Sequence, residues 1–596
     1  MQSIPVDLVL NGEYQGTYQF CEQVKISKAR VNIFDWEDYA GDVAKAIYKK
    51  EKSNGMTKDD RDAIETMLAE TDMSWMTSGN VTYNGTTYQI SDYISDMPAA
   101  TGGFLMELDS YYDETSKFTS SKQQPLMFKS PEFFATNTTV MQYVENYINT
   151  FEKAIDASDY TTTYNNETVS YSQLFDMDSL VQYWMVEELF MNVDAMKKST
   201  YMYKDIDGKF YMGPIWDMDW SSNSLVSQYQ NSGTTNEWQT IKFTDAAQAN
   251  QWYKLIITDP YFAVKAYELY TAMRDEMGTI TADGGTMDTY QALMAESADA
   301  NAAMWYQNES NKKFATQVSS LKTYLKSRLS WLDKQFTSPE NLAKSLGYTT
   351  AGGVTVSADD MVTKKTKETV ITAKVTNSSV KSVEFVVNGT TAGVVEVADK
   401  QAVIEIPETA LAEEGTYNTV CIYGLNASGK VLTVNNKKVT DFETFYKGIH
   451  AESDGSDTDG KDDGNKDDGN KDDQNGGDQN NGSQNNGSQN TGTPSTDQSQ
   501  TGVPQENTPS VTEPKVTLNV SYAPMQKKQT TTAIKVTSIY PENDTIVSWE
   551  SSKPSVATVN TKGKIKALKT GTTVITVTTK SGATAACKIK VIKRCV

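Results

Sequence analysis

The segment 449–514 constrains the fold of this chain more than any other feature. Residues 452–478 contain eleven acidic residues against three lysines and repeat the pentad KDDGN, and Asn, Gln, Gly, Ser, Thr and Pro dominate the remainder. Such a sequence has too little apolar surface to offset the entropy cost of folding. We therefore expect a solvated, disordered linker between separately folded bodies. A calcium-loop interpretation is also open, but the closing Glu and flanking helices of an EF-hand are absent.

The composition of the 596-residue chain excludes several classes of protein. Lys and Arg number 55 against 77 Asp and Glu, a net charge of −22, which argues against a nucleic-acid binder because such proteins need clustered basic residues. No apolar run approaches the roughly 20 residues of a membrane-spanning helix. The one histidine, His450, lies beside the linker, so the folded bodies lack a Ser-His-Asp triad and His-rich zinc sites.

The four cysteines are scattered and form neither a CxxC pair nor a zinc-binding spacing. Cys21 and Cys421 lie in strand-like runs. They are predicted to be buried free thiols, because cysteine is among the most often buried residue types. Cys587 and Cys595 could close a small disulfide loop, and the sequence does not decide this point.

Residues 515–596 are strongly basic, with fourteen Lys and Arg against three acidic residues. Alternating runs such as TVITVT (573–578) and KIKVIK (588–593) are typical of half-exposed strands and predict a small all-β sandwich. The charge could attract anionic cell-wall polymers, although a solubilising sheet face is the simpler explanation. The block 547–591 resembles the bacterial immunoglobulin-like group 2 module. This resemblance implies a surface-exposed bacterial protein.

A second β module is predicted over residues 347–448. The segments 369–375, 383–388 and 402–406 have strand patterns, and Asn-Gly at 388–389 is a strong hairpin signal. From this pattern alone we expect an immunoglobulin-like sandwich.

Residues 1–346 mix strands with long helical stretches, which predicts an α+β domain. Helical periodicity covers 179–191, 252–274 and 318–336, and 38–70 is a charged helical insertion. The 179–191 helix is apolar on nearly all sides and is therefore expected to be buried, with Asp178 as a candidate N-cap.

Two acidic loops follow the buried helix. Asp194 comes directly after it, a predicted hairpin spans 201–212, and Asp217 lies in the run PIWDMDW that follows the hairpin. The two carboxylates can therefore face a common cleft. They would suit metal-assisted phosphoryl transfer, in which one Asp orients the hydroxyl nucleophile and the other holds Mg²⁺. They could also act as acid and base in glycoside hydrolysis, or be turn and capping residues.

Four segments, in order, resemble the CotH family of atypical kinases first known from spore coats. They are IPVDLVLNGEYQGTYQFCEQV (4–24), GGFLMELD with FKSPE (102–109, 128–132), the stretch 194–217, and WYKLIITDPYF (252–262) with the helical region 311–331. The resemblance covers about residues 4–336. It implies a protein-kinase-like fold, the use of Mg²⁺ and ATP, and phosphate transfer to Ser or Thr of a Ser-rich surface or coat protein.

By position, the resemblance makes Asp194 the catalytic-loop aspartate and Asp217 the metal-binding aspartate. Asp219 becomes a possible second metal ligand, with a loop cap as the alternative. Ser199 stands where many relatives have the Asn of the second metal site. A hydroxyl can bind Mg²⁺ there, but less well than an amide oxygen.

The same resemblance makes residues 6–20 late N-lobe strands and places Glu22 near the hinge between the lobes. Trp216 and Met106 could wall the nucleotide pocket, with core roles as the alternative. Relatives usually carry earlier N-lobe strands and a phosphate-binding lysine, so we expect an incomplete, truncated N-lobe here. The nearest replacements for that lysine, unless they are surface charges, are Lys25, Lys28 and Lys129.

The sequence therefore predicts a multidomain, extracellular or cell-surface bacterial protein. Its expected parts are the α+β kinase-like domain (1–346), an immunoglobulin-like sandwich (347–448), a disordered linker (449–514) and a bacterial immunoglobulin-like domain (515–596). The leading hypothesis is a CotH-type kinase. The alternatives are a non-catalytic adhesin or scaffold on the same fold, and a carbohydrate-active protein whose aromatic residues stack on sugars.

Overall fold

The structure is a computed structural model with two compact units, Met1–Asp459 and Gly460–Val596, and each is described by itself. The described residues are 3–133, 136–194, 197–222, 234–242, 251–305, 314–358, 368–412, 417–446, 514–518, 522–532, 534–541 and 543–592. Nearly all of the predicted linker, with His450, lies outside these ranges, as do Asn311 and Cys595.

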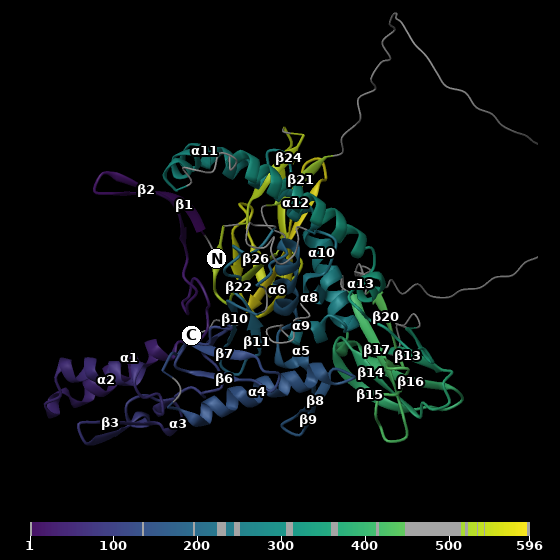
Figure 1. The fold of residues 1–596 in the computed structure, drawn as a ribbon, viewed down its shortest axis with the longest axis horizontal. Helices are drawn as coiled ribbons and strands as arrows, with labels where there is room; N and C mark the ends of the chain where they lie inside the picture. Colours follow the sequence, from purple (N-terminus) through teal and green to yellow (C-terminus); the bar gives the residue numbers. More distant parts are fainter. Residues whose placement is uncertain are drawn as a thin grey trace, which may run out of the picture. The chain divides into compact units, whose positions relative to one another are not determined.

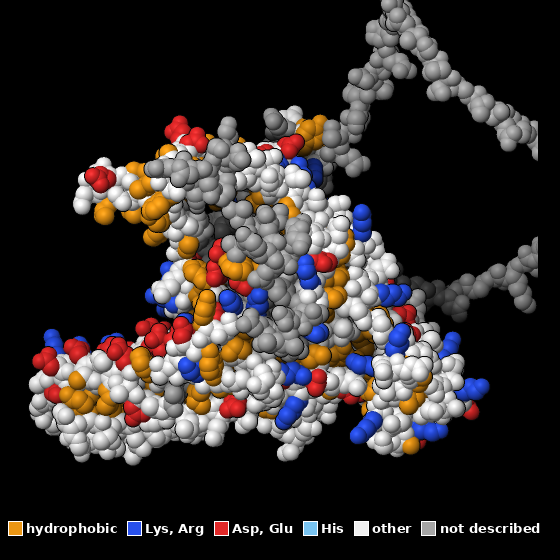
Figure 2. Space-filling model, in the orientation of Figure 1, with side chains coloured by type: hydrophobic (Ala, Val, Ile, Leu, Met, Phe, Trp, Pro, Cys, Tyr) orange, Lys and Arg blue, Asp and Glu red, His pale blue; other side chains and the backbone are white. Residues whose placement is uncertain are grey.

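The first unit opens with the predicted strand pair, an antiparallel hairpin of β1 (Ser3–Leu10) and β2 (Glu13–Cys21) (Figure 1). The hairpin rests on helix α11 (Thr286–Trp305), where the Thr17 amide donates to Asn301 Oδ1 at 2.9 Å. Hydrophobic side chains gather on its open surface (Figure 2). Cys21 is exposed at the end of this ribbon, so the prediction that its thiol is buried is wrong.

The charged insertion is a pair of helices, as predicted: α1 (Trp36–Glu51) and α2 (Lys58–Glu70), joined by the short η1 (Lys52–Asn54). Asp35 caps α1 by accepting the amides of Glu37 and Asp38. The elements that follow are α3 (Trp75–Ser78), β3 (Asn80–Tyr83), β4 (Thr86–Gln89) and η2 (Ile90–Asp92).

A five-stranded antiparallel sheet lies at the centre of the α+β domain, in the order β11-β10-β5-β7-β6. Its strands are β5 (Phe104–Leu108), β6 (Lys117–Thr119), β7 (Pro125–Ser130), β10 (Thr200–Lys204) and β11 (Phe210–Met212). Strands β10 and β11 form the hairpin predicted between the two acidic loops. Along β5, Phe104, Met106 and Leu108 face the main core, whereas Leu105 belongs to a separate cluster on the other face.

Two long helices, α4 (Thr138–Asp156) and α6 (Met177–Phe190), contribute to the main core, and nine residues of α6 are buried, as its sequence predicts. The predicted N-cap is wrong by two residues. Asp176 caps α6 by accepting the Ser179 amide at 2.9 Å, while Asp178 is exposed in the first turn.

The helix expected over 252–274 is two helices, α9 (Gln251–Ile256) and α10 (Pro260–Thr281). Asp259 accepts the Tyr261 amide as the N-cap of α10, and Pro260 occupies the first turn, so the chain ends one helix and starts another. The remaining elements are β8 (Thr161–Tyr164), β9 (Glu167–Ser170), α5 (Tyr171–Leu174), α8 (Gln239–Lys242), α12 (Phe314–Gln335) and α13 (Pro339–Ser345).

The described residues of the first β domain, 354–446, form two main sheets around a shared core, in the orders β12-β13-β16 and β15-β14-β17-β20, and a two-stranded pair β18-β19. Asn388 and Gly389, with φ of 49° and 73°, make the predicted hairpin turn. The elements are β12 (Val354–Ala358), β13 (Glu368–Val375), β14 (Ser382–Val387), β15 (Thr390–Glu396), β16 (Gln401–Pro407), η3 (Glu408–Ala410), β17 (Tyr417–Leu425), β18 (Thr433–Val434), β19 (Lys437–Lys438) and β20 (Thr440–Tyr446).

Strand β17 is buried on both faces. Val420 and Ile422 lie inside the first β domain, whereas Cys421 and Tyr423 belong to the core of the α+β domain. Around this apolar contact, the Tyr417 amide donates to Glu268 Oε1 at 2.8 Å. Cys421 is a buried free thiol, as predicted. The outer face of the first β domain is therefore packed into the core of the α+β domain.

The second unit contains the second β domain, residues 514–592, which is all-β as predicted. Its sheets have the orders β22-β29-β28-β25, β23-β27-β26 and β21-β24, and its core includes Ile575, Cys587 and Ile589. The strands are β21 (Lys515–Leu518), β22 (Tyr522–Gln526), β23 (Thr530–Thr531), β24 (Val536–Tyr540), β25 (Ile546–Ser551), β26 (Ala557–Val559), β27 (Ile565–Ala567), β28 (Gly571–Thr579) and β29 (Thr584–Ile592).

Across the ranges that the structure describes, no helix has both the length and the apolar character needed to cross a membrane.

Candidate active site

Backbone hydrogen bonds hold the two predicted acidic loops together. The Val193 amide donates to the Trp220 carbonyl at 3.2 Å, and the Ser222 amide donates to the Phe190 carbonyl at 2.6 Å. Helix α6 ends at Phe190, and its C-cap Met191 has a left-handed conformation. Asp194 lies in the loop that follows, and Asp217 and Asp219 lie in the other loop. These two backbone hydrogen bonds therefore keep the loops next to each other, although they are separated in sequence.

The three predicted carboxylates influence one another. Burial and then the negative charge of Asp217 raise the pKa of Asp219, and the carboxyl groups of these two residues are hydrogen-bonded. The charge of Asp194 raises the same pKa further. The structure thus brings Asp194, Asp217 and Asp219 into one acidic cluster.

Lys197 neutralises part of this cluster. Its Nζ lies 3.2 Å from Asp194 Oδ1, and the two side chains are only 10% and 17% exposed. Nothing in our sequence reasoning identified Lys197. Its three-residue spacing from Asp194 was a usable signal, because a loop that curls after a helix brings such residues together.

Ser199 lies beside the metal-site candidate Asp217. Its hydroxyl donates to Asp217 Oδ2 at 3.3 Å, and its amide donates to Asp109 Oδ2 at 2.9 Å. Both Ser199 and Asp217 have positive φ, 45° and 60°, which is unusual for non-glycine residues and is found preferentially at functional sites. The buried Asp109, which also accepts the Tyr111 amide, holds Ser199 in place and was missed by our sequence reasoning.

Lys129, one of the three candidate lysines, is held on this sheet face by two ion pairs. Its Nζ lies 3.4 Å from Glu107 Oε2 and also pairs with Glu114. Burial raises the pKa of Tyr201, and the charges of Glu107, Asp109 and Asp217 raise it further. Tyr201 therefore lies between the Lys129–Glu107 pair and the acidic cluster.

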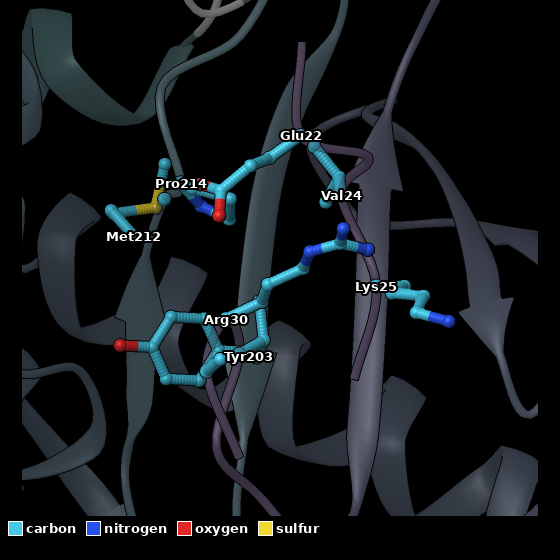
Figure 3. Close-up of a pocket in the computed structure, with 10 residues that line it drawn as sticks. Glu22, Val24, Lys25, Arg30, Tyr203, Met212 and Pro214 are labelled. Atoms are coloured by element: carbon cyan, nitrogen blue, oxygen red, sulfur yellow. The ribbon is translucent and has the colours of Figure 1, made fainter. Parts of the chain in front are cut away.

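A cavity of about 220 Å³ opens between the segment after β2 and the ends of β10 and β11 (Figure 3). The predicted hinge residue Glu22 lines it and points toward the strand end that carries Met212 and Pro214 (Figure 3). Lys25 also lines this cavity, whereas Lys28 is exposed and is not part of its wall. The remaining lining residues are Val24, Ala29, Arg30, Val31, Tyr203 and Gly213.

The two candidate wall residues lie on opposite faces of the sheet. Trp216 packs with Ile26, Leu105 and Tyr201, in the same cluster as Tyr203 of the cavity wall. Met106 is fully buried in the main core, the position that its alternative interpretation expects. The cavity and the acidic cluster thus share one face of the sheet, and Met106 lies behind it.

Comparison with solved structures finds weak likenesses. These include the C-terminal 282-residue fragment of intimin in complex with the translocated intimin receptor (13% identity, 40% of this chain and 63% of that chain, TM-score 0.11). Others are fibronectin(III)-like modules of Clostridium thermocellum CbhA (13%, 40% and 95%, 0.11) and surface layer protein SbsC domains 1–6 (11%, 94% and 72%, 0.10). This chain therefore spans less than two thirds of the intimin fragment, and TM-scores this low carry no argument. No curated protein sequence matches the chain.

Family models give a clear result. The model of the bacterial Ig-like domain (group 2) matches residues 510–589, in agreement with the resemblance of the basic C-terminal block. The model of the CotH kinase protein matches residues 2–332, which contain every predicted site residue and more than half of the chain. The chain belongs to the CotH kinase protein family and carries a bacterial Ig-like group 2 domain after the kinase-family region.

Proposed function

We propose that the α+β domain transfers the γ-phosphoryl group of ATP to a Ser or Thr hydroxyl of a Ser-rich cell-surface or coat protein. Membership of the CotH kinase family supports a kinase-like function. The observation that carries the proposal is the convergence of Asp194, Asp217 and Asp219 beside a cavity on the same face of the sheet.

Asp194 is assigned the acceptor hydroxyl. In the transfer, the hydroxyl oxygen bonds to the γ-phosphorus, the bond to the β,γ-bridging oxygen breaks, ADP leaves, and the hydroxyl proton passes to the Asp194 carboxylate. Lys197, whose Nζ lies 3.2 Å from Asp194 Oδ1, fixes the direction of this carboxylate. The same ammonium lies close enough to Asp194 to offset negative charge on an incoming phosphate.

The donor set fits Mg²⁺. Within the described residues there is no group of three or more His, Cys, Asp or Glu that could hold a metal ion alone. Mg²⁺ is usually held by one or two carboxylates together with substrate phosphates, so the pair Asp217 and Asp219 is sufficient. Burial and then repulsion from Asp217 raise the pKa of Asp219, and a divalent cation relieves such repulsion. When bound, the ion would neutralise phosphate charge, and the Ser199 hydroxyl, 3.3 Å from Asp217 Oδ2, offers a further oxygen.

The cavity is the proposed site of the nucleotide base. Its apolar wall is formed by Val24, Val31 and Met212, together with the aromatic ring of Tyr203. Its volume of about 220 Å³ suits part of a nucleotide rather than the whole. Lys129, held by Glu107, is the proposed phosphate-facing lysine on the same sheet face.

The surface location of this activity is also proposed. The CotH family and the bacterial Ig-like domain are both consistent with a protein of the cell surface or coat. The basic second β domain could add contact with anionic wall polymers.

Titration calorimetry of Mg²⁺-ATP into the full chain tests the proposal. Asp217→Asn should weaken binding at least tenfold, whereas Asp194→Asn should bind within about twofold of wild type and lose phosphate transfer by about a hundredfold or more. Asp178→Asn, an exposed carboxylate in the first turn of α6, is the matched control. Equal affinity of wild type, Asp217→Asn and Asp178→Asn would contradict the proposal.

A non-catalytic scaffold is the second candidate. It is favoured by Ser199, whose hydroxyl replaces the amide of many relatives and already bonds Asp217. A folded full chain that shows no nucleotide binding at millimolar Mg²⁺-ATP would select the scaffold over the kinase.

A further inference from the structure

Two buried polar residues at the end of α6 lie behind the acidic cluster. Glu187 and Asn192 are 2% and 3% exposed, although each carries a strongly polar side chain. Buried polar groups persist where they are hydrogen-bonded and where the resulting geometry matters. The contacts of this Glu187–Asn192 pair lead to both acidic loops.

Asn192 reaches each loop with one side of its amide. Its Oδ1 accepts the Asp194 amide at 3.1 Å, which closes a local turn around the catalytic candidate. Its Nδ2 donates to the sulfur of Met218 at 3.6 Å, and Met218 lies between the two metal-site candidates. The Asn192 side chain therefore contacts the backbone of Asp194 and the residue between Asp217 and Asp219.

Glu187 lies beside that amide. Burial raises the pKa of its carboxyl group to about 7, the nearby Asn192 and Tyr183 side chains oppose this rise, and its Oε2 has no hydrogen-bond partner among the described residues. Because Oδ1 of Asn192 accepts the Asp194 amide, the NH₂ group is the side of Asn192 that can donate to this carboxylate. The backbone reinforces the arrangement, because the Asn192 amide donates to the Glu187 carbonyl at 3.1 Å.

We propose that Glu187 and Asn192 are positioning residues that hold the Asp194 loop in register with the loop carrying Asp217 and Asp219. They touch no reacting atom and act through the backbone of Asp194 and the side chain of Met218. The assignment of Asp194 and Asp217 as reacting residues rests on the proposed function, but the mechanical coupling of the two loops does not.

Hydrogen–deuterium exchange of the full chain tests the coupling directly. Asn192→Ala should raise exchange in the peptides covering 190–194 and 217–222 by about tenfold, because the turn and the contact to Met218 are both lost. Glu187→Leu should do the same, and Glu187→Gln, which keeps an accepting oxygen, should restore protection. The control is Glu384→Gln, a buried glutamate of β14 whose pKa burial likewise raises to about 7.

Unchanged exchange in both peptides, equal to that of Glu384→Gln, would overturn the proposal. If Asn192→Ala speeds exchange throughout the first unit, Asn192→Ser takes its place, since the serine oxygen can still accept the Asp194 amide. Exchange that rises equally everywhere in both Asn192 variants would also overturn it.

Kinetics provide a readout that a purely structural role would not give. Where wild type transfers phosphate, Glu187→Leu should lower kcat by about 10- to 100-fold and change the KM for ATP by less than about threefold, with Glu187→Gln close to wild type. A rise in KM without loss of kcat would contradict positioning of Asp194. No transfer or nucleotide binding by wild type would refute the proposed function, while the exchange data would still decide the coupling.

Discussion

The two β domains of this chain are both built from packed sheets, but the outer faces of their strands have different surroundings. In the second β domain, strand β28 alternates strictly between buried and half-buried residues, so one face meets the core and the other meets solvent. In the first, strand β17 is buried along nearly its whole length, and its outer face joins the core of the α+β domain. The comparison teaches that the second behaves as a separate module and that the first packs as part of the α+β domain.

The largest expected effect follows from cutting the chain. A chain ending at residue 346 leaves open the apolar surface that β17 covers, at a loss of roughly 1.5–3 kcal/mol for each large side chain uncovered. We expect aggregation or loss of cooperative unfolding. A chain ending at 446 should unfold at the same temperature as the first unit of the full chain. Scanning calorimetry of the two truncated chains measures their unfolding temperatures. Equal stability of the two would contradict the different roles assigned to the two β domains.

A single substitution gives the next largest effect. Tyr423→Ala on the outer face of β17 should lower the free energy of unfolding by about 3–5 kcal/mol, because it opens a cavity in the shared core. Thr576→Ala, on the outward face of β28, should change it by less than about 1 kcal/mol. Urea unfolding of each unit measures both. Similar losses in the free energy of unfolding at the two positions would show that the outer face of β17 is not part of a core.

The pH dependence of the two regions should have opposite signs. Burial raises the pKa of Asp259, at the start of α10 beside the first β domain, to about 6 from 3.8. Its contribution is therefore most favourable below pH 4 and is lost as pH rises to 6. In the second β domain, hydrogen bonds from Ser581 and Thr579 lower the pKa of Asp544 to about 2, so its stabilisation is present above pH 4 and lost on acidification.

Unfolding of each unit between pH 2.5 and 7 checks these signs. Asp259→Asn should flatten the fall in stability of the first unit between pH 4 and 6, and Asp544→Asn should flatten the acid loss of the second. Parallel pH profiles of the two units, unaffected by either substitution, would contradict the assignment of these carboxyl groups.

Local patterns predicted much of this fold. The β1–β2 pair, the β10–β11 hairpin, the helices of the charged insertion and the turn at Asn388–Gly389 all follow from periodicity and turn chemistry within a few residues. The grouping of Asp194 with Asp217 followed in the same way, because one short hairpin separates them. The end of α9 and the start of α10 at Asp259–Pro260 also have a local signal, a capping residue followed by proline, which our prediction of one helix missed.

What could not be predicted depends on partners far apart in sequence. Cys21 has the neighbours of a buried strand residue, yet its ribbon leaves it exposed. Asp109 acquires its role only when β5 and β10 pair and bring it to the Ser199 amide, ninety residues away. In the sequence, Glu187 is indistinguishable from the other residues of a buried helix. Its position beside Asn192 depends on the turn that follows the helix. The Lys129–Glu107 pair likewise exists only through the register of β5 and β7.

Strand β5 lies at the boundary between the core and the site, and this has a consequence for how the protein tolerates change. Phe104, Met106 and Leu108 serve only the packing of the interior, whereas Leu105, Glu107 and the following Asp109 serve the face that carries the carboxylates. Neighbouring positions of one strand are thus under different constraints, one from core packing and the other from the site. Substitutions at alternate positions will divide between those that lower the amount of folded protein and those that leave it abundant but inactive.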